Sequence, residues 1–181
     1  EQNTDIVLVD TGNSYEGLCE YFNGKYISYT EEHPITMNPF QIKREEWNIE
    51  KLGFLKNLVM LIWKGSQGTV TKTEDKLIEQ VINEYYEAHF GKDSIGRLCF
   101  NSFYEFSTRR IPEICDENGL RGIDLASYNY LLKEFYKGGS HELTLNENMD
   151  SSLFDETFIV FEIDSVKDDP LLFPLVTLII M

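Results

Sequence analysis

The sequence predicts an α/β fold in which a mostly parallel sheet is interrupted by an all-α insertion. Two short apolar runs, Ile6–Val9 and Phe158–Phe161, each end in an acidic residue, Asp10 and Glu162. Uninterrupted apolar runs of this length are typical of parallel strands buried on both faces. The long segment between them has helical periodicity, so we expect one sheet that carries a large helical insertion.

Composition and charge limit what the chain can do. Of 181 residues, 42% are hydrophobic and 13% aromatic, which excludes global disorder. The 31 acidic and 16 basic residues give a net charge of -15. This charge argues against nucleic-acid binding by the bulk surface, because phosphate neutralisation needs clustered Lys and Arg. Arg109 and Arg110 form the densest basic spot and are expected to make surface ion pairs.

Cysteine and histidine give no support to a disulfide framework or a metal site. The three residues of each kind are dispersed, and no Cys-x-x-Cys or His-x-x-x-His spacing occurs. The longest apolar run, Leu171–Met181, contains Pro174 and is too short to span a bilayer. A reduced, cytoplasmic setting is therefore expected.

Residues 1–44 are expected to form the first part of the α/β core. After Asp10 the sequence Thr-Gly-Asn-Ser has the chemistry of a tight turn, and residues 15–22 can start a short helix. Residues 24–29 alternate and predict a short strand or a hairpin arm. Pro39 excludes a central strand and predicts a fixed turn around Asn38 and Phe40.

Residues 45–140 are expected to form an all-α subdomain of four helices. Asn48 is a candidate N-cap for a helix that runs to about Lys64. Thr71 and Glu74 have the spacing of a capping box for the next helix, which is expected to end near Gly91.

Two further helices complete this subdomain. Ser102 is a candidate N-cap for the third helix, with a kink or break at Pro112 and Gly119 placed just beyond the helix end. The fourth is expected from about Asp124 to Lys137. Given the acidic charge, the aromatic residues of these helices are expected to pack in a core and not to stack on bases.

Residues 141–181 are expected to form the second part of the α/β core. Residues 141–145 predict a strand arm, and the second buried strand follows. Asp168, Asp169 and Pro170 then predict the start of an apolar helix. Because the chain begins without Met and ends inside this apolar stretch, we expect an internal segment of a longer protein.

No motif for nucleotide or nucleophilic chemistry is complete. The phosphate loop Gly-x-x-x-x-Gly-Lys-Ser/Thr is absent, since Gly24 and Lys25 lack both the first glycine and the hydroxyl residue. Glu162 and Asp164 point the same way on a strand and suggest the acid and base of a stand-alone hydrolase. Without further site motifs, we expect these two carboxylates and Asp10 to be solvated.

Several stretches occur in an order that is more informative than any one of them. They are Ile-Val-Leu-Val-Asp-Thr-Gly-Asn-Ser-Tyr at 6–15, Gly-Lys-Tyr at 24–26, Asn-Pro-Phe at 38–40, Phe-Asn-Ser-Phe-Tyr-Glu-Phe at 100–106, Gly-Gly at 138–139 and Phe-Ile-Val-Phe-Glu-Ile-Asp at 158–164. This order resembles the TraG family of conjugative elements, the hexameric motor ATPases of type IV secretion.

The resemblance implies a partial RecA-like P-loop NTPase sheet, interrupted by helices at 45–137, between the family's Walker A and Walker B motifs. The family's phosphate-binding Lys and Mg²⁺-binding acid then have no counterpart here, and Glu162 lies on the strand before Walker B. No cofactor or metal is expected to bind this segment, whereas ATP and Mg²⁺ are expected for the intact protein. Asp10 and Thr11 are the candidate nucleotide-proximal residues.

The resemblance also implies that the intact protein hydrolyses ATP to drive DNA or protein transfer through a type IV secretion channel. Such a protein would be a hexamer, peripheral at the cytoplasmic face of the inner membrane, with other secretion components as partners. The segment itself is expected to be inactive and to supply scaffold and a helical lid. An alternative from another class stays open: the helical subdomain is an acidic protein-interaction module with no role in nucleotide binding.

Overall fold

A computed structural model describes residues 5–91 and 96–181, and the chain forms two compact units. The α/β unit consists of residues 1–37 and 147–181, and the helical unit consists of residues 38–146. The sequence predicts these limits at 44/45 and 140/141. In the structure, residues 38–44 and 141–146 belong to the helical unit and not to the α/β unit. The first four residues of the predicted first segment lie outside the described residues.

Within residues 5–37 and 147–181, the sheet of the α/β unit has three parallel strands, β1 (Ile6–Asp10), β2 (Lys25–Ser28) and β3 (Phe158–Glu162). The order is β1-β3-β2, so the last strand in sequence lies in the middle. Ile6 pairs with Phe158 and Asp10 with Glu162. The predicted pair of neighbouring parallel strands, separated by a helical excursion, is confirmed. The hairpin alternative for residues 24–29 is wrong, because β2 runs parallel to β3.

The prediction that the first strand is buried on both faces is wrong for the described residues. Ile6 is 44% exposed and Val7 50% exposed, because β1 pairs with β3 alone and forms one edge of the described sheet. All five residues of the central strand β3 are buried. Burial of an apolar run thus depends on neighbours that the run itself does not specify.

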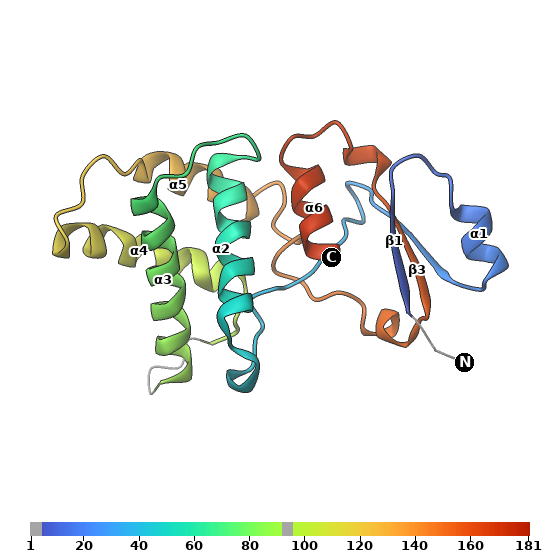
Figure 1. Ribbon diagram of the computed structural model, residues 1–181, viewed down its shortest axis with the longest axis horizontal. Coiled ribbons are helices and arrows are strands. Elements are labelled where there is room, and N and C mark those ends of the chain that lie inside the picture. Colours follow the sequence, from blue (N-terminus) through green and yellow to red (C-terminus); the bar gives the residue numbers. More distant parts are fainter. Residues whose placement is uncertain (1–4, 92–95) are drawn as a thin grey trace. The chain divides into compact units, whose positions relative to one another are not determined.

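One face of the sheet is covered by α1 (Glu16–Tyr21), as Figure 1 shows beside β1. Cys19 of α1 packs against Phe158 and Val160 of β3. The turn into β2 passes so close to β3 that a Cβ atom at Gly24 would lie 2.6 Å from the Phe158 carbonyl oxygen. Glycine is therefore required where β2 begins.

The C-terminal part of the α/β unit contains short 3-10 turns and a last helix. The turns lie at Ser151–Asp155 and Asp164–Val166, and α6 spans Leu172–Ile180. The carboxylate of Asp169 accepts hydrogen bonds from the Leu171 and Leu172 N–H groups, at 2.8 and 2.7 Å. The predicted acidic start of an apolar helix is confirmed.

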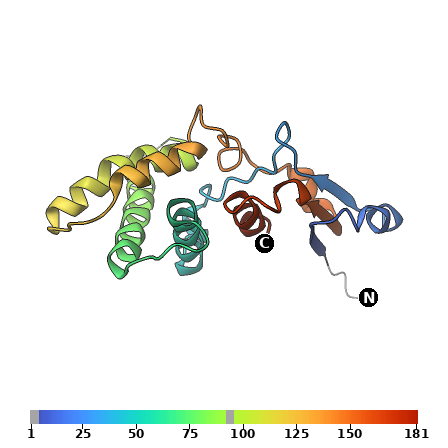
Figure 2. The ribbon, with the colours of Figure 1, turned by 90° about the horizontal axis from the view of Figure 1, so that it is seen from above.

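The described residues of the helical unit form four α-helices, with α2 and α3 side by side in Figures 1 and 2. Asn48 caps α2 (Ile49–Lys64) by accepting from the N–H groups of its first turn, and Thr71 and Glu74 form the capping box of α3 (Lys72–Phe90). Both predicted caps are confirmed. The remaining helices are α4 (Phe100–Glu117) and α5 (Leu125–Leu132), with 3-10 turns at Arg44–Glu46 and Lys133–Phe135.

The third helix differs from its prediction at its start and in its middle. Cys99 is the N-cap, and Ser102 lies in the first turn, where its hydroxyl accepts a hydrogen bond from the Cys99 N–H. The helix also continues through Pro112. Pro112 is exposed, so the carbonyl four residues earlier, which lacks its helical donor, lies on the solvent-facing side.

The predicted strand arm at residues 141–145 is wrong. The N–H groups of Glu142, Thr144 and Asn146 each donate to the carbonyl three residues earlier, and the segment forms consecutive turns. The buried Asn146 side chain holds these turns in place, because its amide donates to the carbonyls of Phe135 and Glu142.

The core of the helical unit is rich in aromatic rings. Phe40 is fully buried, stacks on Phe103 with ring centroids 5.1 Å apart, and accepts a hydrogen bond at its carbonyl from Tyr86. The turn that begins at Asn38 thus anchors the helices, since the Asn38 amide also donates to the Leu98 carbonyl. These contacts confirm core packing for the aromatic residues.

Arg110 makes the surface ion pairs that were expected of it. Its guanidinium binds Glu84 of α3 at 2.6 Å and Glu117 of α4 at 2.7 Å. Within the described residues, no helix is both long and apolar enough to cross a membrane.

Candidate functional site

Two buried carboxylates lie side by side at the carboxyl ends of β1 and β3. Asp10 and Glu162 are register partners, and their exposed fractions are only 5% and 4%. The expectation that both are solvated is wrong. Ligands of open parallel sheets bind beyond the carboxyl ends of the strands, so this edge is the candidate site.

Asp10 organises the turn that follows β1. Its carboxylate accepts hydrogen bonds from three backbone N–H groups, those of Gly12 at 3.2 Å, Ser14 at 2.7 Å and Tyr15 at 3.0 Å. Burial is the largest influence and raises the pKa of Asp10, but the three N–H bonds outweigh it and the net pKa is lowered. Asp10 is therefore a carboxylate at neutral pH, held by the turn that it stabilises.

Glu162, at the end of β3, connects that turn to β2. Its Oε2 atom accepts from the Asn13 N–H at 3.0 Å and from the Tyr26 hydroxyl of β2 at 3.2 Å, and Oε1 accepts from the Asp164 N–H at 2.7 Å. Burial, together with the charge of Glu162, raises the pKa of Tyr26 to about 12. The phenol therefore remains a donor throughout the neutral range.

The exposed surface of this edge comes from the turn and not from the carboxylates. Thr11 and Ser14 are exposed, and Asn13 has a positive φ of 52°, which turns the backbone toward Glu162. Of the two predicted nucleotide-proximal residues, Thr11 is open to solvent, whereas Asp10 is enclosed. Their proximity to a nucleotide stays a prediction.

Glu162 and Asp164 do not form the acid and base pair considered from the sequence. Strand β3 ends at Glu162, and Asp164 begins the next 3-10 turn, where its carboxylate pairs with Lys167 at 2.7 Å. Glu162 instead lies beside Asp10 and bonds to Asn13 and Tyr26, contacts that were not predicted from the sequence. Two apolar runs that each end in an acid were the available signal, because parallel strands in register bring such ends together.

The oxygens of the pair are already satisfied by the protein. Each of the four carboxylate oxygens of Asp10 and Glu162 accepts at least one hydrogen bond. Within the described residues, no three His, Cys, Asp or Glu side chains are grouped to hold a metal ion. The hydrogen bonds of Asp10 and Glu162 are directed to backbone N–H groups and to Tyr26, so what these residues do in this structure is position the turn.

Comparisons with known proteins agree with this architecture. The structure is similar to VirB4 of Thermoanaerobacter pseudethanolicus with a TM-score of 0.60 and 18% sequence identity, over 92% of this chain. The chain spans 44% of the length of that protein. No curated protein sequence matches the chain. The family model described as TraG P-loop domain matches residues 1–181. This chain therefore belongs to the TraG P-loop domain family.

Proposed function

We propose that this chain is the scaffold and helical part of a motor ATPase of type IV secretion, the system that drives conjugative transfer. The observation that carries the proposal is the in-register pair Asp10 and Glu162, on parallel strands that precede and follow the helical unit in the sequence, in a chain of the TraG P-loop domain family. Likeness to VirB4 in fold supports the same conclusion.

In this proposal, the two carboxylates are positioning residues. They hold the Thr11–Ser14 turn at the carboxyl edge of the sheet, with the Thr11 hydroxyl facing the nucleotide of the intact protein. The phosphate-binding loop and the Mg²⁺-binding acid come from segments that this chain does not contain, because its sequence has no Gly-x-x-x-x-Gly-Lys-Ser/Thr motif. A hexameric assembly at the inner membrane belongs to the same proposal.

The alternative, an acidic helical interaction module, is not favoured by the distribution of charge. Residues 38–146 contain 16 acidic and 14 basic residues, a net charge of -2. Residues 1–37 and 147–181 contain 15 acidic and 2 basic residues, a net charge of -13. The excess of acidic residues therefore lies in the α/β unit and not in the helices.

The test compares two proteins: this chain and the product of its complete natural reading frame. We expect Mg²⁺-dependent ATP hydrolysis from the complete protein and none from residues 1–181. In the complete protein, Thr11→Val should lower kcat and change KM by a smaller factor. Thr30 is an exposed threonine next to β2, and Thr30→Val should change neither kcat nor KM. Hydrolysis by this chain alone, or a complete protein without ATPase activity, would refute the proposal.

A further inference from the structure

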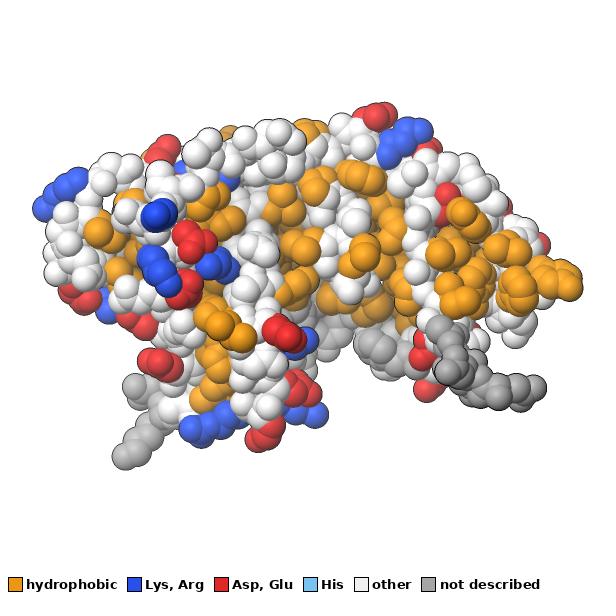
Figure 3. Space-filling view, viewed as in Figure 1, with side chains coloured by type: hydrophobic (Ala, Val, Ile, Leu, Met, Phe, Trp, Pro, Cys, Tyr) orange, Lys and Arg blue, Asp and Glu red, His pale blue; other side chains and the backbone are white. Residues whose placement is uncertain are grey.

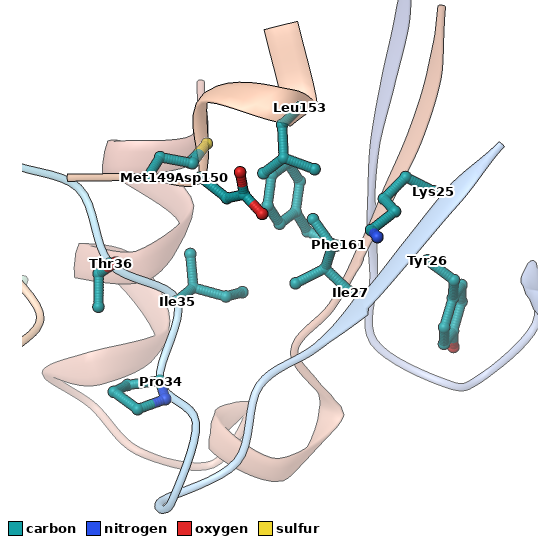
Figure 4. A pocket seen from close by; sticks show the side chains of 10 residues that line it. All are labelled: Lys25, Tyr26, Ile27, Pro34, Ile35, Thr36, Met149, Asp150, Leu153 and Phe161. Atoms are coloured by element: carbon teal, nitrogen blue, oxygen red, sulfur yellow. The ribbon is translucent and has the colours of Figure 1, made fainter. Parts of the chain in front are cut away.

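A hollow in the α/β unit lies away from the carboxylate pair, on the face of β2 and β3 that is opposite to α1. It has a volume of about 340 Å³, at the lower end of the range for small-ligand sites. Figure 4 shows Ile35, Leu153 and Phe161 turned toward one another, with Tyr26 directed away on the opposite side of β2. The hollow therefore has an apolar floor and is separate from the Tyr26 and Glu162 contact.

The strand that borders this hollow has a free edge. Within the described residues, β2 pairs only with β3. The Tyr29 N–H donates to the Glu162 carbonyl at 2.8 Å, and N–H groups alternate in direction along a strand, so the Ser28 N–H points away from β3. An edge of this kind is a template for another extended chain.

The surroundings of the hollow are acidic. The lining includes one Lys, Lys25, and one Asp, Asp150, both exposed. The segments that build its walls also carry the exposed residues Glu31, Glu32 and Asp155. With a net charge of -13 in this unit, an anionic ligand such as a nucleotide is disfavoured here and a cationic one is favoured.

We propose that this hollow is a docking site for an extended, basic peptide segment of a partner protein. The segment adds to the free edge of β2 through backbone hydrogen bonds, and one large apolar side chain enters the space between Ile35, Leu153 and Phe161. Its Lys or Arg side chains face Asp150 and the neighbouring acids. Backbone pairing supplies affinity, and the hollow and the charges supply specificity. This inference does not depend on the ATPase proposal, since it uses neither the carboxylate pair nor a nucleotide.

The test uses a random seven-residue peptide library displayed on phage, selected against the immobilised full chain. We expect selected sequences with an apolar residue flanked by Lys or Arg. As synthetic peptides they should bind with a Kd that rises at least tenfold between 50 and 500 mM KCl. In NMR titrations, the amide signals of residues 25–28 and 34–36 should shift.

Two variants locate the binding site. Ile27→Trp fills the hollow from β2, and Ser28→Pro removes the outward N–H of β2 while leaving the bond from Tyr29 to β3. Each should weaken binding at least tenfold, whereas Leu18→Trp on the exposed face of α1 should not change it. Circular dichroism checks that the variants fold. If a variant does not fold, the position of the NMR shifts in the unmodified chain decides where the peptide binds. Enrichment of no basic sequence, or shifts confined to the exposed apolar residues of α1, would overturn the proposal.

Discussion

The two units of this chain solve the problem of stability in different ways. The helical unit has nearly balanced charge and a core of stacked aromatic rings around Phe40 and Phe103. The α/β unit carries almost all of the net charge, and its sheet has three short strands with both edges free among the described residues. Figure 3 shows hydrophobic side chains gathered at its surface around α1, where Leu18, Tyr21 and Phe22 are exposed.

This difference indicates where each unit derives its order. The helical unit is ordered by burial of large side chains, whereas the turn of the α/β unit is ordered by hydrogen bonds to two carboxylates. Contiguous apolar surface of the kind seen around α1 marks an interaction face. We therefore expect the helical unit to be the more stable of the two, which native-state hydrogen exchange on the full chain measures as slower exchange in α2, α3 and α4.

The largest effect is expected from the aromatic core. Phe103→Ala should lower the free energy of unfolding of the helical unit by about 3–5 kcal/mol, because it leaves a cavity next to Phe40 and Tyr85. Tyr130→Ala, at a side chain that is 73% exposed, should change it by less than about 0.5 kcal/mol. Chemical denaturation followed by circular dichroism measures both. Equal effects would mean that the core does not dominate.

A smaller effect is expected at the carboxylate pair. Asp10→Ala leaves three backbone N–H groups without their acceptor and should destabilise the α/β unit by about 2–4 kcal/mol. Thr11→Ala, one residue along the same turn, removes no acceptor of these bonds and should be neutral. Hydrogen exchange of the Ser14 and Tyr15 amides reports the result directly. Unchanged protection in Asp10→Ala would show that the turn holds without the carboxylate.

Acid should weaken both units through one buried carboxylate in each. Burial raises the pKa of Glu74, but the Lys64 ammonium and the Thr71 hydrogen bonds lower it by more. The net pKa of Glu74 is therefore lowered, as is that of Asp10. The unfolded chain then binds more protons than the folded one near the ordinary carboxylate values of 3.8 and 4.5. The stability from these groups is present above those values and is lost as pH falls through the folded values. Chemical denaturation at pH 7, 5 and 3 measures this loss, and the free energy of unfolding of both units should be lowest at pH 3.

The smallest effect is expected at the ion pairs of Arg110. Arg110→Met should cost about 0.5–1 kcal/mol through the lost Glu84 pair, and less in high salt, because the pair is partly exposed. Arg121→Met is the matched control, since its pair with Asp116 is 3.7 Å long and largely exposed. A salt-independent loss in Arg110→Met would indicate lost packing and not lost charge.

Local features of this fold follow from the sequence, and features that join distant segments do not. Asn48, Thr71 and Glu74 act within one helical turn, so their capping roles are readable from spacing. The N-cap of α4 was predicted at Ser102 and not at Cys99, because a serine hydroxyl can accept a backbone N–H bond at the N-cap position or in the first turn. The exposure of Ile6 and Val7 depends on which strands lie beside β1, which no local pattern encodes.

The candidate site shows the same limit more sharply. Asp10 and Thr11 were identified because the acid ends an apolar run, but the burial of Asp10 depends on partners elsewhere in the chain. The bond from Asn13 to Glu162 joins residues separated by 149 positions. Neither periodicity nor the family resemblance gave the strand order β1-β3-β2. The resemblance also supported discarding Glu162 as a site residue, which the hydrogen bonds of that residue reverse.

The position of β3 in the middle of the sheet has a consequence for synthesis on the ribosome. Neither β1 nor β2 has a described partner other than β3, so both must wait for its appearance. Roughly 150 residues lie between β1 and β3; at a synthesis rate of about 5–20 residues per second, β3 is made about 8–30 seconds after β1. Throughout this interval the nascent strand β1 has no partner in the sheet, and its apolar residues are open to other contacts.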